Sequence, residues 1–404
     1  MVAYQDFVAL CQSGDSEDRG RAAHLAAMAY LGHIGPADEQ AALYAALIGF
    51  LDDPSVKVRA ALAYGLLHAC GAPRPILLAL LHDSPIIARA VAQYSPALVD
   101  ADLIGLVRTA EPTMLVAVTM REHISQRLAE ALIARGKRLV TLRVLRRSDI
   151  PIAPQVLIDL AEGPGSTDAQ IRGALLNRAD LPASARLHLV HVVAGALRAA
   201  RMVRGAVAPH RLERLLRNTT DTAMTGIGER EAAAGGRVPY AAELIAAERI
   251  STRVMLHAIV NGHVLFLAEC LAELAAAPRD KVFTLLGSGS RVALNALLAR
   301  CGLRESVRNM ICRLIFHARA ADLADDVAAR HFVVTALTEE LIVEHDGVIP
   351  PELEEAFAYL SEQNVLLARH AARGVMTAFA GDVHGASPMP VDIEEPERLA
   401  LPAA

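Results

Sequence analysis

Arginine and lysine side chains gather in the middle of the chain, where they could bind phosphate groups or the carboxylates of an acidic protein. The residues that carry this prediction are a cluster within 13 positions, Arg135, Lys137, Arg138, Arg143, Arg146 and Arg147, and a triplet, Arg198, Arg201 and Arg204. The triplet recurs at every third position, as does a second one (Arg211, Arg214 and Arg217), so each is predicted to follow one broad side of a helix. Guanidinium groups presented together can bind phosphate or carboxylate oxygens in pairs.

The composition of this basic segment bears on the kind of ligand it would bind. Residues 121–217 contain 17 Lys and Arg against 8 Asp and Glu, although the full chain carries a net charge of −5. They contain no Phe, Tyr or Trp, whereas proteins that bind single strands or RNA use base stacking worth about 1–3 kcal/mol per base. We therefore expect an acidic protein partner. Contact with the phosphates of a nucleic acid duplex is the alternative, and a solvated helix face with arginines paired to acids of the next repeat is the purely structural interpretation.

Histidine positions offer two candidate sites. His188 and His191 are three residues apart and could face one metal ion, but no Asp, Glu or Cys within a turn completes the ligand set. Arg253, His257 and Asn261 form a polar stripe at spacings of four through an otherwise apolar segment. That stripe could serve acid–base chemistry, but we predict an internal hydrogen-bond ladder between packed helices.

Three further segments contain residue types found in active or binding sites. His345-Asp346-Gly347 near several glutamates is predicted to be a turn before a helix beginning at Pro351-Glu352. His370-x-x-Arg373-Gly374 resembles the strip around the histidine of phosphotransfer domains, with one position substituted. Gly287-Ser288-Gly289-Ser290 could hold an anion, but it fits a C-cap glycine followed by an N-cap serine. No nucleophile or dinucleotide motif is present, so we predict no catalytic, metal or cofactor site, and a protein that is not an enzyme.

The elements that position these residues are predicted from a repeat of 26 residues. The equivalent apolar positions are Leu81, Val107 and Ile133 in one series and Leu98, Ile124 and Ile150 in another. An upstream copy lies 30 residues before the first, and a downstream copy, lengthened by the insert 163–167, places Leu181 in the position of Ile150. Such a period is typical of a helical repeat array, in which each unit buries its apolar face against its neighbours.

One repeat carries the pattern of a HEAT-type unit between Leu51 and Leu62. We expect Asp53 to cap the second helix of this unit, and Val58 and Leu62 to face the core. Arg59 is expected to reach an acidic group in an adjacent repeat. The following units are shorter, with prolines at their joints, so they also fit leucine-rich-repeat-variant arrays.

The composition agrees with an all-helical chain. Ala and Leu dominate, aromatic residues make up 4%, and the hydrophobic content of 53% fits many amphipathic helices. The longest apolar run, 254–268, is too short and too polar to span a bilayer, and the N-terminus lacks the features of a signal peptide. Five cysteines without a C-x-x-C pair indicate a reducing cytoplasm.

These observations predict an all-α chain in four parts. Residues 1–217 form a right-handed α-solenoid of short HEAT-like repeats, and residues 218–239, rich in Gly, Thr and Ala, form a linker. Residues 240–377 form a helical C-terminal domain. The proline-spaced, acidic tail 378–404 is predicted to be disordered.

Several C-terminal segments resemble a bacterial family called domain of unknown function 2336, typically met in alphaproteobacteria. The resemblance is carried by Ile250–Ala258 with Asn261-Gly262-His263, by Lys281–Leu286, and by Ala293–Leu303. Pro96-x-Leu98-x-x-x-Asp102-Leu103 fits the repeat region of that family, and the match spans most of 40–375. The resemblance implies an all-helical repeat fold without an assigned activity, and it supplies no catalytic residue.

The function predicted from the sequence is a non-enzymatic scaffold or adaptor that binds another protein. Repeat arrays suit this role because they present a large surface to which each unit contributes a few contacts. The alternative is binding of duplex phosphates or of an acidic partner through the basic segment 121–217.

Overall fold

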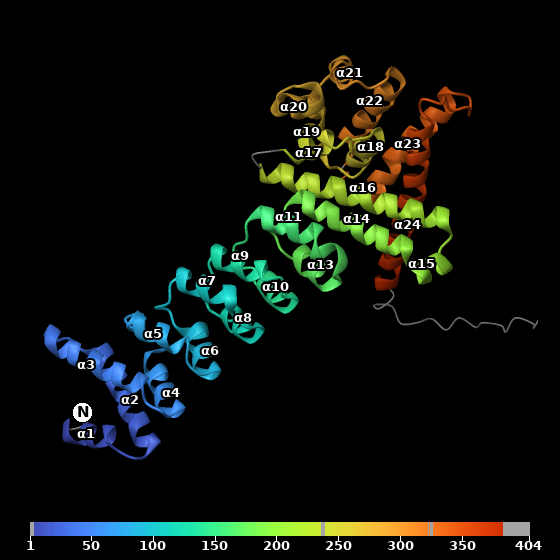
Figure 1. Ribbon diagram of the computed structural model, residues 1–404. Coiled ribbons are helices and arrows are strands. Elements are labelled where there is room, and N and C mark those ends of the chain that lie inside the picture. The colour runs from blue at the N-terminus through green and yellow to red at the C-terminus, as the bar shows by residue number, and fades with distance from the viewer. Residues whose placement is uncertain (1–3, 236–238, 322, 324–325, 383–404) are drawn as a thin grey trace, which may run out of the picture. The chain divides into compact units, whose positions relative to one another are not determined.

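The computed structural model describes residues 4–235, 239–321, 323 and 326–382, and over these ranges the chain is helical, without a strand (Figure 1). The all-α prediction is therefore confirmed. The chain divides into two compact units, Met1–Val193 and Ala194–Ala404, which we call the N-terminal and C-terminal units. The division lies before residue 217, the end that the repeat pattern predicted for the first domain.

The N-terminal unit consists of short helices, several of which begin with proline. Pro85, Pro112 and Pro154 each occupy the first turn of a helix, where the missing N–H has no intrahelical acceptor to lose. The helices are α1 (Tyr4–Cys11), α2 (Ser16–Gly32), α3 (Ala37–Leu51), α4 (Val56–Leu66), α5 (Arg74–Leu80), α6 (Pro85–Tyr94), α7 (Asp100–Thr109), α8 (Pro112–Thr119), α9 (Gln126–Ala134), α10 (Arg138–Leu145), α11 (Pro154–Glu162), α12 (Pro164–Thr167), α13 (Ala169–Leu176) and α14 (Ala183–Ala199), the last of which crosses the boundary between the units.

Alternate helices of the N-terminal unit lie side by side. Helix α4 contacts α6, α6 contacts α8, α8 contacts α10 and α10 contacts α13, which forms one row (Figure 1). In the other row, α3 contacts α5 and α7 contacts α9. Each pair of helices therefore packs against the next pair along the chain, as the 26-residue period predicts.

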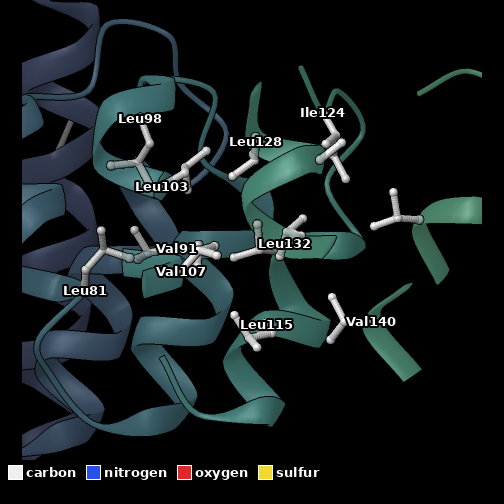
Figure 2. Close-up of a cluster of buried hydrophobic side chains, with 14 of the residues drawn as sticks. Leu81, Val91, Leu98, Leu103, Val107, Leu115, Ile124, Leu128, Leu132 and Val140 are labelled. Atoms are coloured by element: carbon white, nitrogen blue, oxygen red, sulfur yellow. The ribbon is translucent and has the colours of Figure 1, made fainter. Parts of the chain in front are cut away.

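The predicted repeat positions form the core between these helices. Leu81, Val107 and Ile133 are buried, with at most 9% of their surface exposed, and Leu98, Ile124, Ile150 and Leu181 are buried as well. Figure 2 shows Leu81, Leu98, Val107 and Ile124 in one apolar cluster that continues from repeat to repeat. The residues that the 26-residue period relates to one another are therefore core residues.

A ladder of buried arginines joins successive turns of the N-terminal unit. Arg121 donates to the carbonyls of Ala92 (2.6 Å) and Ser95 (2.8 Å) of the preceding repeat. Arg147, 26 residues later, donates to the carbonyl of Glu122 (2.7 Å). Carbonyls at helix ends lack intrahelical partners, so the Arg121 guanidinium satisfies acceptors that would otherwise be buried unpaired.

Arg178 continues this ladder across the five-residue insert. Its guanidinium, 4% exposed, donates to the carbonyls of Arg147 (2.9 Å) and Ile150 (2.9 Å) and pairs with Asp180. We expect Arg178→Met to lower the free energy of unfolding by about 2 kcal/mol, because charged hydrogen bonds to buried carbonyls are lost. Urea unfolding followed by circular dichroism measures this loss against Arg127→Met, which alters an exposed side chain of α9. Equal stability of the two variants would contradict the role assigned to the ladder.

The core and pairing contacts predicted for the HEAT-type unit are confirmed, and Val58 and Leu62 are fully buried. The predicted cap is wrong: Ser55 is the N-cap residue of α4, and Asp53 accepts the N–H of Ser55 instead of an N–H of the helix. Arg59 pairs with Asp83 of the next repeat, with Nε 2.6 Å from Oδ2. This hydrogen-bonded guanidinium lowers the pKa of the Asp83 carboxyl, so the pair is ionised at neutral pH.

The C-terminal unit is built around longer helices. Helix α19 contacts α16, α17, α18, α20 and α21, and every residue of α18 from Arg253 to Val260 is buried. Gly228 of α16 lies against the ring of Phe266, where a Cβ atom would come within 2.2 Å of the ring, so the two helices need glycine at this crossing. The helices are α15 (Arg201–Ala206), α16 (Pro209–Ala234), α17 (Tyr240–Ala246), α18 (Thr252–Val260), α19 (Val264–Ala275), α20 (Arg279–Ser288), α21 (Arg291–Arg300), α22 (Glu305–Arg319), α23 (Val327–Glu344) and α24 (Glu354–Asp382).

Two predicted boundaries in this unit are wrong. Residues 218–234, assigned to a linker over 218–239, are the second half of α16, and Gly235 ends that helix in a left-handed conformation. Their Asn, Thr and Gly residues have low helix propensity, but they pack against α18 and α19, and tertiary contacts outweigh propensity. Helix α24 runs to Asp382, beyond the predicted start of the tail at 378, and residues 383–404 lie outside the described residues.

Candidate functional site

The basic cluster of the sequence is divided between two ends of a short helix. Lys137 and Arg138 lie at the start of α10, whereas Arg143 and Arg146 lie at its end. Eight helical residues span about 12 Å, so the two groups do not form one patch on the helix. Arg135 and Arg147 lie just outside α10, at its beginning and its end respectively.

Four of the nine predicted binding residues are held by other groups of the chain. Arg135 donates to the carbonyls of Arg108 (2.6 Å) and Ala110 (3.2 Å), and Arg147 belongs to the ladder. Arg138 pairs with Asp168, and Arg198 pairs with Glu213 (2.6 Å). These residues therefore follow the structural interpretation, in which arginines pair within the array and between adjacent helices.

The other five predicted residues are exposed, and within the described residues their side chains make no hydrogen bond or ion pair: Lys137, Arg143, Arg146, Arg201 and Arg204. The triplet at 198, 201 and 204 does not follow one helix. Helix α14 ends at Ala199 and the extended conformation of Ala200 starts α15 at Arg201, so the prediction for this triplet is wrong. Arg211, Arg214 and Arg217 do share one helix, α16.

One exposed side chain lies just before each of four equivalent repeat positions: Ser95 and the ladder residues Arg121, Arg147 and Arg178. Tyr94 and Met120 precede Ser95 and Arg121, with 49% and 52% of their surface exposed. Arg146 and Asn177 precede Arg147 and Arg178 at the same repeat position, and both are exposed. We call Tyr94, Met120, Arg146 and Asn177 the turn row.

The ladder fixes the spacing of the turn row. Because Arg121 binds the turn after Tyr94, and Arg147 binds the turn after Met120, successive members of the row lie on neighbouring turns. Packed helices are about 8–10 Å apart, which sets the distance from one member to the next. Two apolar side chains are thus followed by a cation along one edge of the N-terminal unit.

A groove of about 840 Å³ runs beside the turn row. It is lined by Tyr94 and Met120 together with His68 and His123, and its lining also contains three carboxylates, those of Asp100, Glu122 and Asp149. The ring centroids of His68 and Tyr94 are 5.5 Å apart at an edge-on angle of 60°, so the two rings that line the groove pack against each other.

The polar stripe of the sequence lies in a buried network of the C-terminal unit. Arg253 donates from Nε to Asp221 (2.7 Å), and its Nη1 lies 3.3 Å from a carboxylate oxygen of Glu362. Asn218 accepts from the same guanidinium, whose carbon lies 4.8 Å from the ring centroid of Tyr359. One cation is thus shared by two carboxylates, an amide and an aromatic ring.

His257 extends this network as a neutral imidazole. The Tyr359 hydroxyl lies 2.9 Å from Nδ1, and the Thr222 hydroxyl lies 3.1 Å from Nε2. Thr222 donates its own proton to a carbonyl of α16, so it accepts from Nε2–H and leaves Nδ1 to accept from Tyr359. Burial lowers the pKa of His257 to about 4 and raises the pKa of Asp221. Asn261 donates to the His257 carbonyl (2.8 Å), and the predicted hydrogen-bond ladder is confirmed.

Three of the remaining sequence candidates have a structural explanation, whereas His370 is an exposed residue of α24. His188 bonds Ser166 (3.0 Å), and among the described residues no group of three His, Cys, Asp or Glu is arranged to hold a metal ion. Ser290 accepts the N–H of Ala293 as an N-cap, as predicted. Asp346 and Gly347 have positive φ and form the predicted turn, although the next helix begins at Glu354 rather than at Pro351.

The sequence interpretation missed the network partners and the turn row. Asp221 and Asn218 were assigned to the linker, and Tyr359 and Glu362 lie more than a hundred residues from Arg253, where no short spacing connects them. The signal for the turn row was available, because Tyr94, Met120 and Arg146 share the 26-residue period.

No helix in the described part of the chain is long and apolar enough to cross a membrane. No curated protein and no solved structure matches the chain. The sequence profile of a bacterial family described as "Uncharacterised protein conserved in bacteria (DUF2336)" matches residues 87–343, which reach from α6 to α23. This match covers more than half of the chain and confirms the resemblance noted from Ile250–Ala258 and Ala293–Leu303. The chain therefore belongs to the DUF2336 family of bacterial proteins.

Proposed function

We propose that this protein is a non-enzymatic adaptor that binds another protein along the turn row of its N-terminal unit. In this proposal the unit is a right-handed α-solenoid of HEAT-like repeats. Two observations favour the solenoid: in two rows of the unit, helices contact alternate helices along the chain, and the core positions recur with the repeat. The single observation that carries the binding function is the exposure of Tyr94 and Met120 at equivalent repeat positions beside a groove.

Exposed aromatic and methionine side chains of this kind are typical anchors of protein interfaces. Tyr is enriched among the residues that dominate binding energy, and Met is enriched in interface cores relative to the rest of the surface. The ladder holds the backbone of both residues rigidly, so little conformational entropy is lost when a partner covers them.

The order of residues along the turn row defines the chemistry of the partner. Tyr94 and Met120 would each contact an apolar side chain of the partner, and Arg146 would pair with an acidic side chain of the partner. Neighbouring members are about 8–10 Å apart, which equals about three residues of an extended segment or six of a helix. The partner is therefore a segment with two apolar residues and then an acidic residue at these spacings.

The protonated state of three cysteine thiols favours a binding role for the protein over catalysis in which one of these thiols is the nucleophile. Burial raises the pKa of Cys270 and Cys312, and it raises that of Cys301 to about 11, so these thiols stay protonated and unreactive near neutral pH. All five cysteines are free, as expected in a reducing compartment.

Binding of duplex phosphates through segment 121–217 stays an alternative prediction. It would depend on the unpaired Arg143 and Arg146 rather than on Arg147, whose guanidinium is used by the ladder. A steep fall of affinity with salt would favour it.

A photo-crosslinking experiment tests the adaptor proposal. A crosslinking amino acid replaces Met120 in one variant and Ile86 in another. Ile86 is 71% exposed and lies in the first turn of α6, the helix that ends at Tyr94. We expect a reproducible protein adduct from position 120 and none from position 86, with the crosslinked peptide carrying an acidic residue near its apolar ones. No adduct, or the same adduct from both positions, would reject the turn row as the binding surface.

Affinity for the captured partner is then compared between matched substitutions. We expect Tyr94→Ser with Met120→Ser to weaken binding by about 30-fold or more, since an anchor contributes about 2 kcal/mol. Arg146→Glu should weaken it further, whereas Lys137→Glu, at the other end of α10, should not. The control pair Ile86→Ser and Leu139→Ser removes exposed apolar side chains from the opposite helix ends. Equal losses in both pairs would contradict the proposal.

A further inference from the structure

The C-terminal unit contains a second candidate binding surface, a groove between α16 and α24. Its volume is about 470 Å³, and Leu215, Val365 and Leu366 form an apolar floor. Leu215 and Val365 keep 43% and 52% of their surface exposed, so this floor is only partly covered within the described residues. An apolar strip of this kind at the junction of two long helices fits a short chain segment.

Three arginines give the groove a strongly cationic rim. Arg211 and Arg214 project from α16, and Arg369 projects from α24. The only carboxylate among the residues that line the groove is Glu362, which is bound by Arg253 and Asn218 and lies 3.5 Å from Arg214. The charge of the rim therefore stays unbalanced, and it favours an acidic occupant.

We infer that this groove docks an acidic segment of the same chain, Val391-Asp392-Ile393-Glu394-Glu395. In an extended segment, alternate side chains point to opposite sides, so Val391 and Ile393 share one side and Asp392 and Glu394 the other. The apolar pair suits the floor of the groove, and the carboxylates suit its arginine rim. Pro388, Pro390 and Pro396 flank the segment, and proline disfavours a helix there.

The dimensions of the groove and the length of chain agree with this assignment. Along α24 the groove runs from Ala358 to Arg369, about 16 Å, which is the length of about five extended residues. From Asp382, the end of α24, back to Arg369 is about 20 Å of helix, and the nine residues to Val391 reach about 30 Å when extended. The segment can therefore enter at Arg369 and run antiparallel to α24.

The docked segment would act as an intramolecular competitor for acidic partners of this groove. A tethered segment is present at an effective concentration of about millimolar, so an external peptide of the same kind would be excluded from the full chain. This role is separate from the turn row, and the two proposals can fail independently, because their residues belong to different units.

A peptide-binding experiment tests the inference. The probe is a fluorescein-labelled peptide of residues 388–399, and its affinity is measured by anisotropy for the full chain and for a chain ending at Asp382. We expect the shortened chain to bind at least tenfold more tightly. Replacing the peptide's acidic residues by amides, or Val391 and Ile393 by Ser, should remove this binding. Equal affinity for both chains, or no binding to either, would overturn the inference.

Substitutions of the rim distinguish the groove from general charge attraction. In the shortened chain, Arg211→Glu with Arg369→Glu should reduce peptide affinity at least tenfold; both residues are exposed, so folding should be kept. The control, Arg230→Glu with Arg249→Glu, makes the same charge change at exposed positions outside the groove, one of them on α16. Equal reductions in both pairs would overturn the groove as the docking site. Binding that depends on the rim but is equal in full and shortened chains would show that a segment of another protein is the occupant, and would overturn the tail segment.

Discussion

Replacing Arg253 by methionine is expected to destabilise the C-terminal unit by about 3–5 kcal/mol, because it leaves the buried carboxylate of Asp221 without its cation and removes one of the two arginines that contact Glu362. Asp221 and Glu362 both bind this guanidinium, and the Asp221 side chain is 9% exposed. Methionine has a similar length and keeps most of the packing, so the loss reports the unpaired charge rather than a cavity. Urea unfolding of the full chain, followed by circular dichroism, measures the difference.

Two further variants test the cause of that loss. Arg249→Met removes an exposed arginine of the same unit and should change stability by less than about 0.5 kcal/mol. Adding Asp221→Asn to Arg253→Met should recover part of the stability, because the buried charge that lost its cation is neutralised. If the double variant is less stable than Arg253→Met, the unpaired charge is not the reason, and the network would have to act through packing alone.

The core of the N-terminal unit could be predicted from the sequence, because the buried residue at a given position of one repeat is matched by an apolar residue at the same position of the next. Leu81, Val107 and Ile133 are buried at equivalent positions of successive repeats, so an apolar residue recurs at each. The pair between Arg59 and Asp83 was predictable in kind for the same reason: the acid occupies, one repeat later, the position of Asp53.

The boundary of the C-terminal unit was not predictable from local patterns. Asn218, Thr222 and Gly228 are poor helix formers, and together they indicate a loop. In the structure each one serves a tertiary contact: Asn218 binds Arg253, Thr222 bonds His257, and Gly228 admits the Phe266 ring. These partners are distant in sequence, so a short stretch of sequence around residues 218–228 does not show that they stabilise α16.

The basic cluster shows a second limit of reasoning from the sequence. Arg138 and Arg146 are eight residues apart, but the intervening helix places them at opposite ends of α10. Only the structure shows that Arg147 is used to join two turns while its neighbour Arg146 stays exposed. Proximity in sequence therefore identified the charged segment but not the surface that it forms.

Acidification from pH 6.5 to pH 4 is expected to lower the free energy of unfolding, with His257 contributing up to about 3 kcal/mol of the loss. Burial lowers the pKa of His257 to about 4 in the folded state, against an ordinary value of 6.5. Between these values the unfolded chain binds a proton that the folded chain does not, so stability falls as pH falls through this window. Burial lowers the pKa of His263 too, which adds to the effect, whereas the raised pKa of Asp221 opposes it at the acidic end.

A comparison of pH profiles isolates the part due to His257. His257→Gln keeps a side chain that can bond Thr222 and Tyr359 but cannot be protonated in this range, so it should be less stable than the parent at pH 7 and should lose less stability on acidification. The control, His370→Gln, alters an exposed histidine of α24 and should keep the parent profile. Urea unfolding at half-unit pH intervals gives the three curves. A His257→Gln curve parallel to the parent between pH 6.5 and 4 would show that this imidazole becomes protonated in the folded protein, and that the network is open to water.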